Sequence, residues 1–397
     1  MSAASPARLL AFARGSARGG AVHVDFVSLA LALGILLLGL VMVTSASVSI
    51  ASQESGAPFY YLERQLLLTL TGAACALLLF SLRTELLERA SVALLALAMV
   101  LLVIVLIPGI GHAVNGSRRW LRIAGAGFQV SELARMLILI YIASYAVRRE
   151  SELRESFLGL AKPLGLLVCA GALLLAEPDL GAATVLFATG FGVLFLAGAR
   201  LRYVIAMTAI AAAGFGLLAV SSSYRLRRLT AFLDPWADPW NSGFQLTQSL
   251  IAIGRGQWLG VGLGDSVQKL FYLPEAHTDF LFAVLAEELG LVGVVLTLTL
   301  FLALVWRSFH IARLASGAGL KFPAYLASGF GLWVGTQAFI NIGVNMGVLP
   351  TKGLTLPFMS YGRSSLIVAL AWLGLLLRVY HEAMREQRGA ATVRGAS

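Results

Sequence analysis

Long apolar runs recur along the whole of this 397-residue chain and restrict its fold more than any other feature. A helix that crosses about 30 Å of hydrocarbon needs roughly 20 apolar residues. Hydrophobic residues make up 58% of the chain and the mean hydropathy is +0.84, which is more apolar surface than one soluble core could bury. We therefore expect the chain to lie in a bilayer.

Ten of these runs are assigned as spans, so the predicted fold class is an all-α membrane protein, a polytopic bundle of ten transmembrane helices. The spans are 26–50, 65–82, 90–108, 132–147, 163–177, 180–199, 203–221, 280–306, 323–348 and 364–379. Only Pro178 and Asp179 separate the fifth and sixth spans, and fusing these two would reverse the orientation of every later one. The first span is too long for a signal peptide and nine others follow it, so we interpret it as an uncleaved anchor.

The distribution of Lys and Arg orients the bundle. With the N-terminus inside, the inner segments hold 18 of the 30 basic residues and the outer segments hold 11. This bias follows the positive-inside rule, so both termini are predicted to be cytoplasmic. The predicted organisation is an N-terminal tail over 1–25, a membrane domain over 26–380 and a C-terminal tail over 381–397. The net charge of +10 is explained by this topology, and no basic cluster interleaved with aromatics suggests a nucleic-acid partner.

Polar residues gather in three outer segments, 109–130, 224–278 and 349–363. The second lies in a long extracytoplasmic loop, 222–279, between spans 7 and 8. Its high content of Pro, Trp and Gly and its lack of long charge runs predict an ordered loop. The GVGLGDS stretch inside it lacks the preceding strand and the final Lys-Ser or Lys-Thr of a nucleotide-binding loop.

An acid stands at the outer mouth of the eighth span, in the stretch YLPEAHTDFLFAVLAEELG. Pro274 suits a first helical turn, and the positive end of the helix dipole favours an ionised Asp279 that could accept protons. An acid at membrane depth is costly enough to suggest function. Glu287 and Glu288 follow at about 80° and 180° around a continuous helix from Asp279, so only Glu287 is expected to share its cavity.

Further acids and a histidine have more than one interpretation. Glu132 can pair with Arg135 along a helix or bind a ligand. Glu177 and Asp179 flank Pro178, which fits a turn or a cap as well as chemistry. His277 could be a base, a ligand or a structural donor, and a lone histidine builds no metal site.

Basic and hydroxyl side chains in the outer segments could hold an anion. The backbone between Pro350 and Pro357 must be irregular, and such backbone near a bilayer is tolerated where it lines a cavity or is buried in protein. Lys352 and Arg363 in this segment could neutralise phosphates. The candidate substrate-binding residues are Arg118, Arg119, Lys269, Lys352, Ser364 and Ser365.

An acid and several cations at the outer leaflet suit an anionic lipid with a polar head. A carboxylate that takes a proton from an attacking hydroxyl, opposite cations that stabilise a phosphate leaving group, can catalyse glycosyl transfer. A transporter would also line its cavity with acids and broken helices. A scaffold that only recruits partners is a third reading, and these patterns leave the choice open.

The strings NGSRRW, HTDF, PTKGLTLP and SYGRSS, in this order across most of residues 110–380, resemble the SEDS family of shape, elongation, division and sporulation proteins. PTKGLTLP and AEPDLG are more similar to the division members than to the elongation members. The resemblance implies a ten-span peptidoglycan glycosyltransferase that polymerises lipid II at the outer face of the cytoplasmic (inner) membrane, at the division septum. The alternative is a lipid II flippase.

The resemblance also implies roles for particular residues. Asp279 is the catalytic residue, and Arg118, Arg119 and Lys352 hold the pyrophosphate of lipid II. The resemblance assigns no role to the other acids and the histidine; from the residue patterns alone we expect His277, Glu287, Glu288, Glu132, Glu177 and Asp179 to support the site. A family proline is replaced by Val130, and the second glycine of the family string SYGGSS is replaced by Arg363, which adds a bulky cation at the cavity wall.

The implied partners are lipid II, a class B penicillin-binding protein, other membrane proteins of the division machinery and the membrane lipids. No ligand set in the sequence demands a cofactor. A divalent cation, Mg²⁺ or Mn²⁺, that bridges the pyrophosphate is compatible with the same chemistry.

Overall fold

The computed structural model describes residues 22–394 except 115–116, 124–125, 201, 204, 207–208, 210–213, 215–231 and 242. The helices in the first half are α2 (Phe26–Ser55), α3 (Tyr60–Ser81), α4 (Thr84–Leu106), α5 (Val130–Arg148), α6 (Glu150–Glu155), α7 (Phe157–Ala176) and α8 (Leu180–Leu196). Those in the second half are η1 (Pro235–Ala237), α11 (Phe244–Gly256), α12 (Leu281–Gly317), α13 (Lys321–Asn345) and α14 (Arg363–Arg394). Three strands are β1 (His112–Val114), β2 (Ser117–Ile123) and β3 (Ala126–Gln129).

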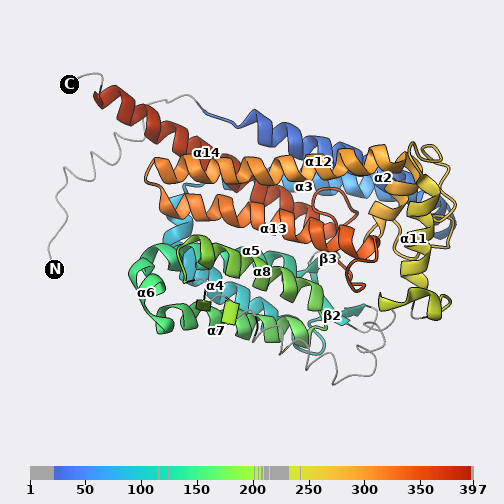
Figure 1. Ribbon diagram of the computed structural model, residues 1–397, viewed down its shortest axis with the longest axis horizontal. Coiled ribbons are helices and arrows are strands. Elements are labelled where there is room, and N and C mark those ends of the chain that lie inside the picture. Colours follow the sequence, from blue (N-terminus) through green and yellow to red (C-terminus); the bar gives the residue numbers. More distant parts are fainter. Residues whose placement is uncertain are drawn as a thin grey trace.

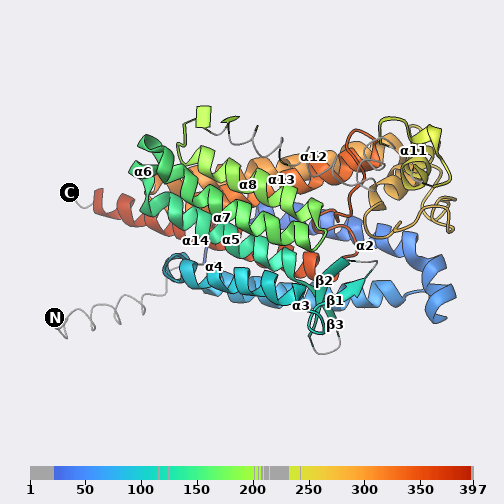
Figure 2. The ribbon, with the colours of Figure 1, turned by 90° about the horizontal axis from the view of Figure 1, so that it is seen from below.

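The long helices lie side by side along the longest axis of the molecule (Figures 1 and 2). The helix pairs α3 and α14, α12 and α13, and α4 and α5 pack along one another. The helix α11 and the strands lie at one end of this bundle, and α6 lies at the other (Figure 1). We call these the sheet end and the α6 end.

Nine of the ten predicted spans coincide with helices. Seven helices in the described ranges, namely α2, α3, α4, α5, α7, α12 and α14, are long and apolar enough to cross a membrane. The helix α8 has 17 residues, and α13 has 25 and carries buried amides. The seventh span, 203–221, lies mostly outside the described residues, and so does the start of the 222–279 loop. The total of ten spans stays a prediction.

The fifth and sixth spans are two helices, as predicted. The chain turns between α7 and α8 over Glu177–Asp179, and the Asp179 carboxylate accepts from the Ala182 N–H at 3.0 Å, capping α8. An oxygen at this position satisfies one of the free amide groups of the first turn. The two helices then pack against each other.

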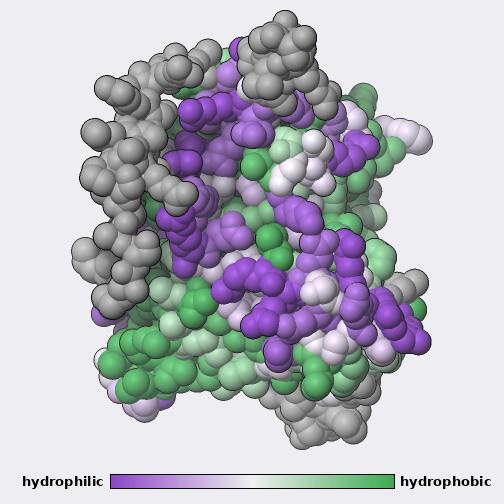
Figure 3. Space-filling view, turned by 90° about the vertical axis from the view of Figure 1, so that its left-hand side faces the viewer, coloured by the Kyte–Doolittle hydropathy of each residue, from purple (hydrophilic) through white to green (hydrophobic). Residues whose placement is uncertain are grey.

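Charged side chains crowd the α6 end. Glu150 pairs with Arg154 at 2.8 Å and with Lys321 at 2.5 Å, linking α6 to α13. Figure 3 shows hydrophilic side chains gathered over this face. The segments around Arg148 and Lys321, which were both predicted to lie on the inner side, lie at this end. The α6 end therefore carries basic residues that the positive-inside rule predicts for one side of the membrane.

The segment 109–130 contains a small antiparallel sheet in the order β1-β2-β3, which the expectation of an all-α chain did not include. Trp120 pairs with Gln129, and Leu121 pairs with Phe128. The sequence SRRWLRI contains Trp120, Leu121 and Ile123, bulky residue types that favour strands, although its apolar residues and arginines do not alternate strictly. The other regular elements among the described residues are helices.

The helix α12 is broken at Gly290, whose φ of 62° and ψ of −160° are not helical. The loop after α11 fills the break: Leu291 N–H donates to the Gln257 carbonyl at 2.9 Å, and Val261 N–H donates to the Glu287 carbonyl at 2.9 Å. A Cβ at position 290 would stand 2.3 Å from the Gly260 nitrogen, so only glycine fits this crossing. The short first part of α12 is therefore joined firmly to the loop that precedes it.

Close backbone contact fixes α14 against α3. A Cβ on Gly374 would stand 2.2 Å from the Ala76 carbonyl oxygen. Small residues at such contacts let membrane helices approach and gain dispersion energy. By contrast, Gly165 on α7 has nothing within 4 Å of the corresponding position.

We predict that Gly374→Ala lowers the stability of the protein in detergent by about 1–3 kcal/mol, because the added methyl group forces α3 and α14 apart. Gly165→Ala is the matched control, and it should be neutral or raise stability by up to about 1 kcal/mol through helix propensity. Thermal unfolding of both variants measures the difference. Equal unfolding midpoints would show that the contact is not constraining.

Candidate functional site

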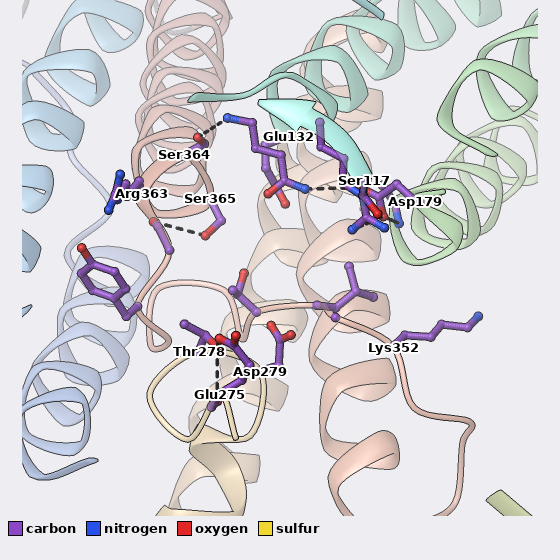
Figure 4. A pocket seen from close by; sticks show the side chains of 18 of the residues that line it. Ser117, Glu132, Asp179, Glu275, Thr278, Asp279, Lys352, Arg363, Ser364 and Ser365 are labelled. Carbon is purple, nitrogen blue, oxygen red and sulfur yellow. Dashed lines mark hydrogen bonds and ion pairs between the residues drawn. The ribbon is translucent and has the colours of Figure 1, made fainter. Parts of the chain in front are cut away.

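A cavity of about 510 Å³ opens at the sheet end of the bundle. Its walls come from β2, β3, the starts of α5, α8, α11 and α14, and the segments before α12 and α14. The charged lining residues are Arg119, Glu132, Asp179, Glu275, Asp279, Lys352 and Arg363. In Figure 4, Asp279 and Glu275 lie on one side of the cavity and Glu132 on the side opposite.

Asp279 lies two residues before α12 and lines this cavity, half-buried. The pKa of its carboxyl is raised to about 7, first by burial and then by the nearby negative charge of Glu275, while Arg119 acts to lower it. A Cβ on Gly353 would stand only 3.0 Å from Asp279 Oδ2, so the glycine leaves the carboxylate accessible. A carboxylate with this pKa is suited to exchanging protons near neutral pH.

The backbone of Asp279 is held by amides on α13. Asn341 Nδ2 donates to the Asp279 carbonyl at 2.8 Å and also to the Leu354 carbonyl. Asn345 Nδ2 donates to the same Asp279 carbonyl at 3.1 Å, and its Oδ1 accepts from the Ala283 N–H at 3.2 Å. One turn earlier, Gln337 Nε2 donates to the Thr355 carbonyl at 3.0 Å. Our sequence reasoning missed these residues, although amides spaced four apart on one helix face of a span were the signal.

Strand geometry separates the two arginines of the NGSRRW string. Arg118 pairs with Ala113 and Trp120 pairs with His112, so Arg119 is the extra residue at a register shift in β2. Arg119 lines the cavity, whereas Arg118 is exposed and does not. Arg119 Nε donates to the Glu177 carbonyl at 3.0 Å, its Nη2 donates to the Pro178 carbonyl at 2.5 Å, and its Nη1 lies 3.9 Å from Asp179 Oδ1. The α7–α8 turn thus holds one arginine of the pair.

Lys352, Ser364 and Ser365 also line the cavity. Lys352 Nζ donates to Thr184 Oγ1 of α8 at 3.2 Å, and burial lowers the pKa of its amine. Ser364 Oγ accepts from the Gln129 N–H at 2.6 Å, which joins α14 to β3. Ser365 Oγ donates to the Gly362 carbonyl at 3.3 Å.

Lys269, Glu287 and Glu288 lie together outside the cavity lining. Lys269 Nζ pairs with Glu288 at 2.7 Å, and Ser45 Oγ donates to the same carboxylate at 2.7 Å. Glu287 is fully buried and accepts from Arg255 Nη1 at 2.9 Å and from Ser266 Oγ at 2.5 Å. Our expectation that Glu287 shares the cavity assumed a continuous helix from Asp279; the helix begins at Leu281, and both glutamates instead anchor the loop after α11.

The remaining predicted acids surround the α5 and α8 starts. Glu132 lines the cavity and pairs with Arg135, as the spacing suggested. Asp179 lines it and accepts from Gln129 Nε2 and Ser131 Oγ, both at 3.2 Å. Glu177 is buried behind this wall with no hydrogen-bond partner for its carboxyl oxygens among the described residues, and burial raises its pKa to about 8.

His277 supports the cavity from behind. Its carbonyl accepts from the Tyr361 N–H at 3.0 Å, and its ring packs against the rings of Tyr61 and Tyr361, with centroids 4.6 Å and 5.6 Å away. Burial lowers the pKa of the imidazole, so the neutral ring is favoured. Over the described residues, no group of three or more His, Cys, Asp and Glu side chains could hold a metal ion.

The site therefore combines a carboxylate that titrates near neutral pH with cations on the walls around it. The carboxylate can take a proton from an attacking hydroxyl, and the cations can stabilise an anionic leaving group. The surrounding helices are apolar on their outer faces, so an amphipathic ligand can approach from the membrane.

Comparison with known proteins agrees with this architecture. The family model described as a cell cycle protein, FtsW/RodA/SpoVE, matches residues 26–385. A probable peptidoglycan glycosyltransferase FtsW from Thioalkalivibrio sulfidiphilus is 56% identical over 350 residues, covering 88% of both chains. The protein of the same name from Methylococcus capsulatus is 51% identical over 365 residues, covering 92% of both chains.

Solved structures show the same fold. A chain of a peptidoglycan synthase complex, described as coordinating polymerization and crosslinking, aligns with a TM-score of 0.74 and 31% identity, covering 91% of this chain and 98% of that one. The rod shape determining protein RodA of Thermus thermophilus aligns with a TM-score of 0.66 and 31% identity, covering 90% and 97%.

The fold and the cavity define a multi-pass, helical membrane protein with an acid and cations at one end. The chain belongs to the FtsW/RodA/SpoVE family of cell cycle proteins, also called SEDS proteins.

We predict that Asn341→Leu impairs both stability and activity. The change keeps the number and branching of the heavy side-chain atoms but removes the donor to two carbonyls. The Asp279 carbonyl keeps Asn345, whereas the Leu354 carbonyl loses this donor, which costs about 1–3 kcal/mol. Phe339→Leu, on the exposed face of the same helix, is the control and should match the wild type. Unfolding midpoints and turnover of both variants provide the measurement; unchanged turnover in Asn341→Leu would mean that the amide does not position Asp279.

Proposed function

We propose that this chain is a peptidoglycan glycosyltransferase that polymerises lipid II into glycan strands during cell division, with Asp279 as its catalytic base. The observation that carries the proposal is the Asp279 carboxylate, which faces a cavity whose walls also carry Arg119 and Lys352. Relatives that are named for this activity match the chain over most of its length and of theirs.

The reaction transfers a glycosyl group between two lipid-linked substrates. Asp279 removes the proton of the acceptor 4-hydroxyl, whose oxygen attacks the anomeric carbon of the donor. The new C–O bond forms as the bond from that carbon to the pyrophosphate oxygen breaks. The leaving pyrophosphate takes the electron pair, Arg119 and Lys352 stabilise its charge, and the configuration is inverted. Arg118, exposed beside Arg119, attracts the substrate from the mouth of the cavity.

The proposed orientation places the sheet end outside. Ten spans within a membrane domain over 26–380 connect cytoplasmic tails over 1–25 and 381–397, and the charged α6 end faces the cytoplasm. The cavity then opens where lipid II is exposed on the outer face of the inner membrane at the septum.

The proposed partners follow from the same assignment. A solved relative belongs to a complex that coordinates polymerization and crosslinking, which supports a class B penicillin-binding protein as the crosslinking partner of this chain. Other division proteins and membrane lipids complete its surroundings.

Asp279→Asn tests the role of the base. The amide keeps the shape but cannot accept the proton, so the rate of strand formation from purified lipid II should fall by roughly 10²–10⁴-fold. Asp265→Asn, in the exposed part of the loop after α11 and outside the cavity lining, is the control and should retain activity. Near-normal synthesis by Asp279→Asn at normal protein levels would refute the role. A flippase would instead move labelled lipid across vesicles without forming polymer.

The pH dependence tests the electrostatics of the base. Only the deprotonated carboxylate can accept a proton, so the rate should rise with pH, be half-maximal near the Asp279 pKa of about 7, and level off above it. Glu275 raises this pKa, so Glu275→Gln should move the midpoint to lower pH and leave the plateau rate close to that of the wild type. A midpoint that stays fixed or rises would contradict this assignment.

A further inference from the structure

Arg363 is a cavity cation that neither the base nor the leaving-group site uses. It is the first residue of α14 and lines the cavity, half-buried. Within the described part of the chain, its guanidinium has no hydrogen bond or ion pair. Its Nη1 lies against β3, 3.9 Å from where a Cβ on Gly127 would stand. A guanidinium that is partly removed from water and has no counter-charge favours an anionic ligand.

The wall around Arg363 is built to favour negative charge. The positive end of the α14 dipole lies at this position. The other acids of the cavity have their own partners: Glu132 pairs with Arg135, Asp179 caps α8, and Glu275 accepts from Thr278 Oγ1 at 2.7 Å. In Figure 4, Arg363 and Lys352 lie on opposite walls, and Asp279 lies between them.

The reaction needs two anion sites. Donor and acceptor are both lipids linked through a diphosphate, and only the donor loses its diphosphate. Two diphosphates held against the same cations would repel each other. Arg119 and Lys352 occupy the wall formed by β2 and α8, so the acceptor's diphosphate requires a cation on another wall.

We infer that Arg363, with the first turn of α14, forms a second anion subsite that holds the diphosphate retained by the acceptor lipid. The inference rests on the proposed function and assigns it a donor side and an acceptor side. With the two diphosphates on opposite walls, the acceptor hydroxyl and the donor carbon meet beside Asp279.

The position of Arg363 also suits the point where a diphosphate joins its lipid. Two residues before it, the ring of Tyr361 packs against Tyr61 of α3 at 5.1 Å. The helix α3 is largely exposed along its apolar length, so its outer face meets the lipid chains. A diphosphate bound by Arg363 can therefore keep its prenyl chain in the bilayer beside α3.

Kinetics with purified lipid II provide the first test. Arg363→Gln should raise KM about tenfold and change kcat less than about twofold, because a charge-assisted contact to bound substrate is lost while Asp279 is untouched. Arg363→Lys keeps the charge and should recover part of the loss. Arg122→Gln, on β2 but outside the cavity lining, is the matched control and should leave KM unchanged. Unchanged KM in Arg363→Gln would overturn the inference.

A change of substrate tests whether Arg363 binds the diphosphate or the stem peptide of the acceptor lipid. The KM effect of Arg363→Gln should persist with a lipid-linked disaccharide diphosphate that lacks the peptide. If the effect disappears with this substrate, Arg363 recognises peptide carboxylates and the subsite assignment is wrong.

Binding provides a test that does not depend on catalysis. In Asp279→Asn, farnesyl diphosphate should bind at two sites, and the double variant Asp279→Asn/Arg363→Gln should retain one. If the single and the double variant bind equal amounts of farnesyl diphosphate and have matching unfolding midpoints, the second subsite is contradicted. If the wild type itself forms no polymer from lipid II, the proposed function is wrong. This outcome differs from failure of the second subsite, which appears as unchanged diphosphate binding in the double variant.

Discussion

The functional end of this molecule depends on hydrogen bonds from one helix to backbone that is not helical. The segments before α12 and α14 leave carbonyls without helical partners, and an unpaired carbonyl away from water costs several kcal/mol. Asn341 and Asn345 satisfy the Asp279 carbonyl, and Asn341 also reaches Leu354. Because both irregular segments are tied to α13, the acid and the wall that carries Lys352 have a fixed spacing.

A second consequence concerns charge. Asp279 sits where burial disfavours its ionised form, while Arg119 opposes that effect. Glu287 and Glu288 are buried as well, but each has a basic partner, and they secure the loop that fills the break at Gly290. Acids with similar placement in the sequence thus have different tasks: the paired ones hold the fold together, and the one facing the cavity is available for chemistry.

Run length and hydropathy predicted nine of the helices, because the bilayer sets the length that an apolar helix needs. Asp279 and the irregular backbone after Pro350 could also be located, since both conflict with an apolar span. The predictions that failed concerned side chains whose position depends on the local direction of the backbone. Glu287 was placed by extending an ideal helix, and the strand whose register shift accompanies the different placement of Arg118 and Arg119 was not assigned. The α13 amides were read as part of a span, because their partners are carbonyls that sequence patterns do not place.

The way Arg119 is held has a consequence for the speed of ligand capture. Main-chain carbonyls of the α7–α8 turn orient its guanidinium, and the nearest carboxylate, on Asp179, stays 3.9 Å away while serving Ala182 and Gln129. An arginine locked to an acid would have to dissociate from that counterion before it could receive a phosphate. The carbonyls that hold Arg119 carry no net charge, and its ion pair with Asp179 is long, so the guanidinium keeps most of its attraction for an arriving anionic head group.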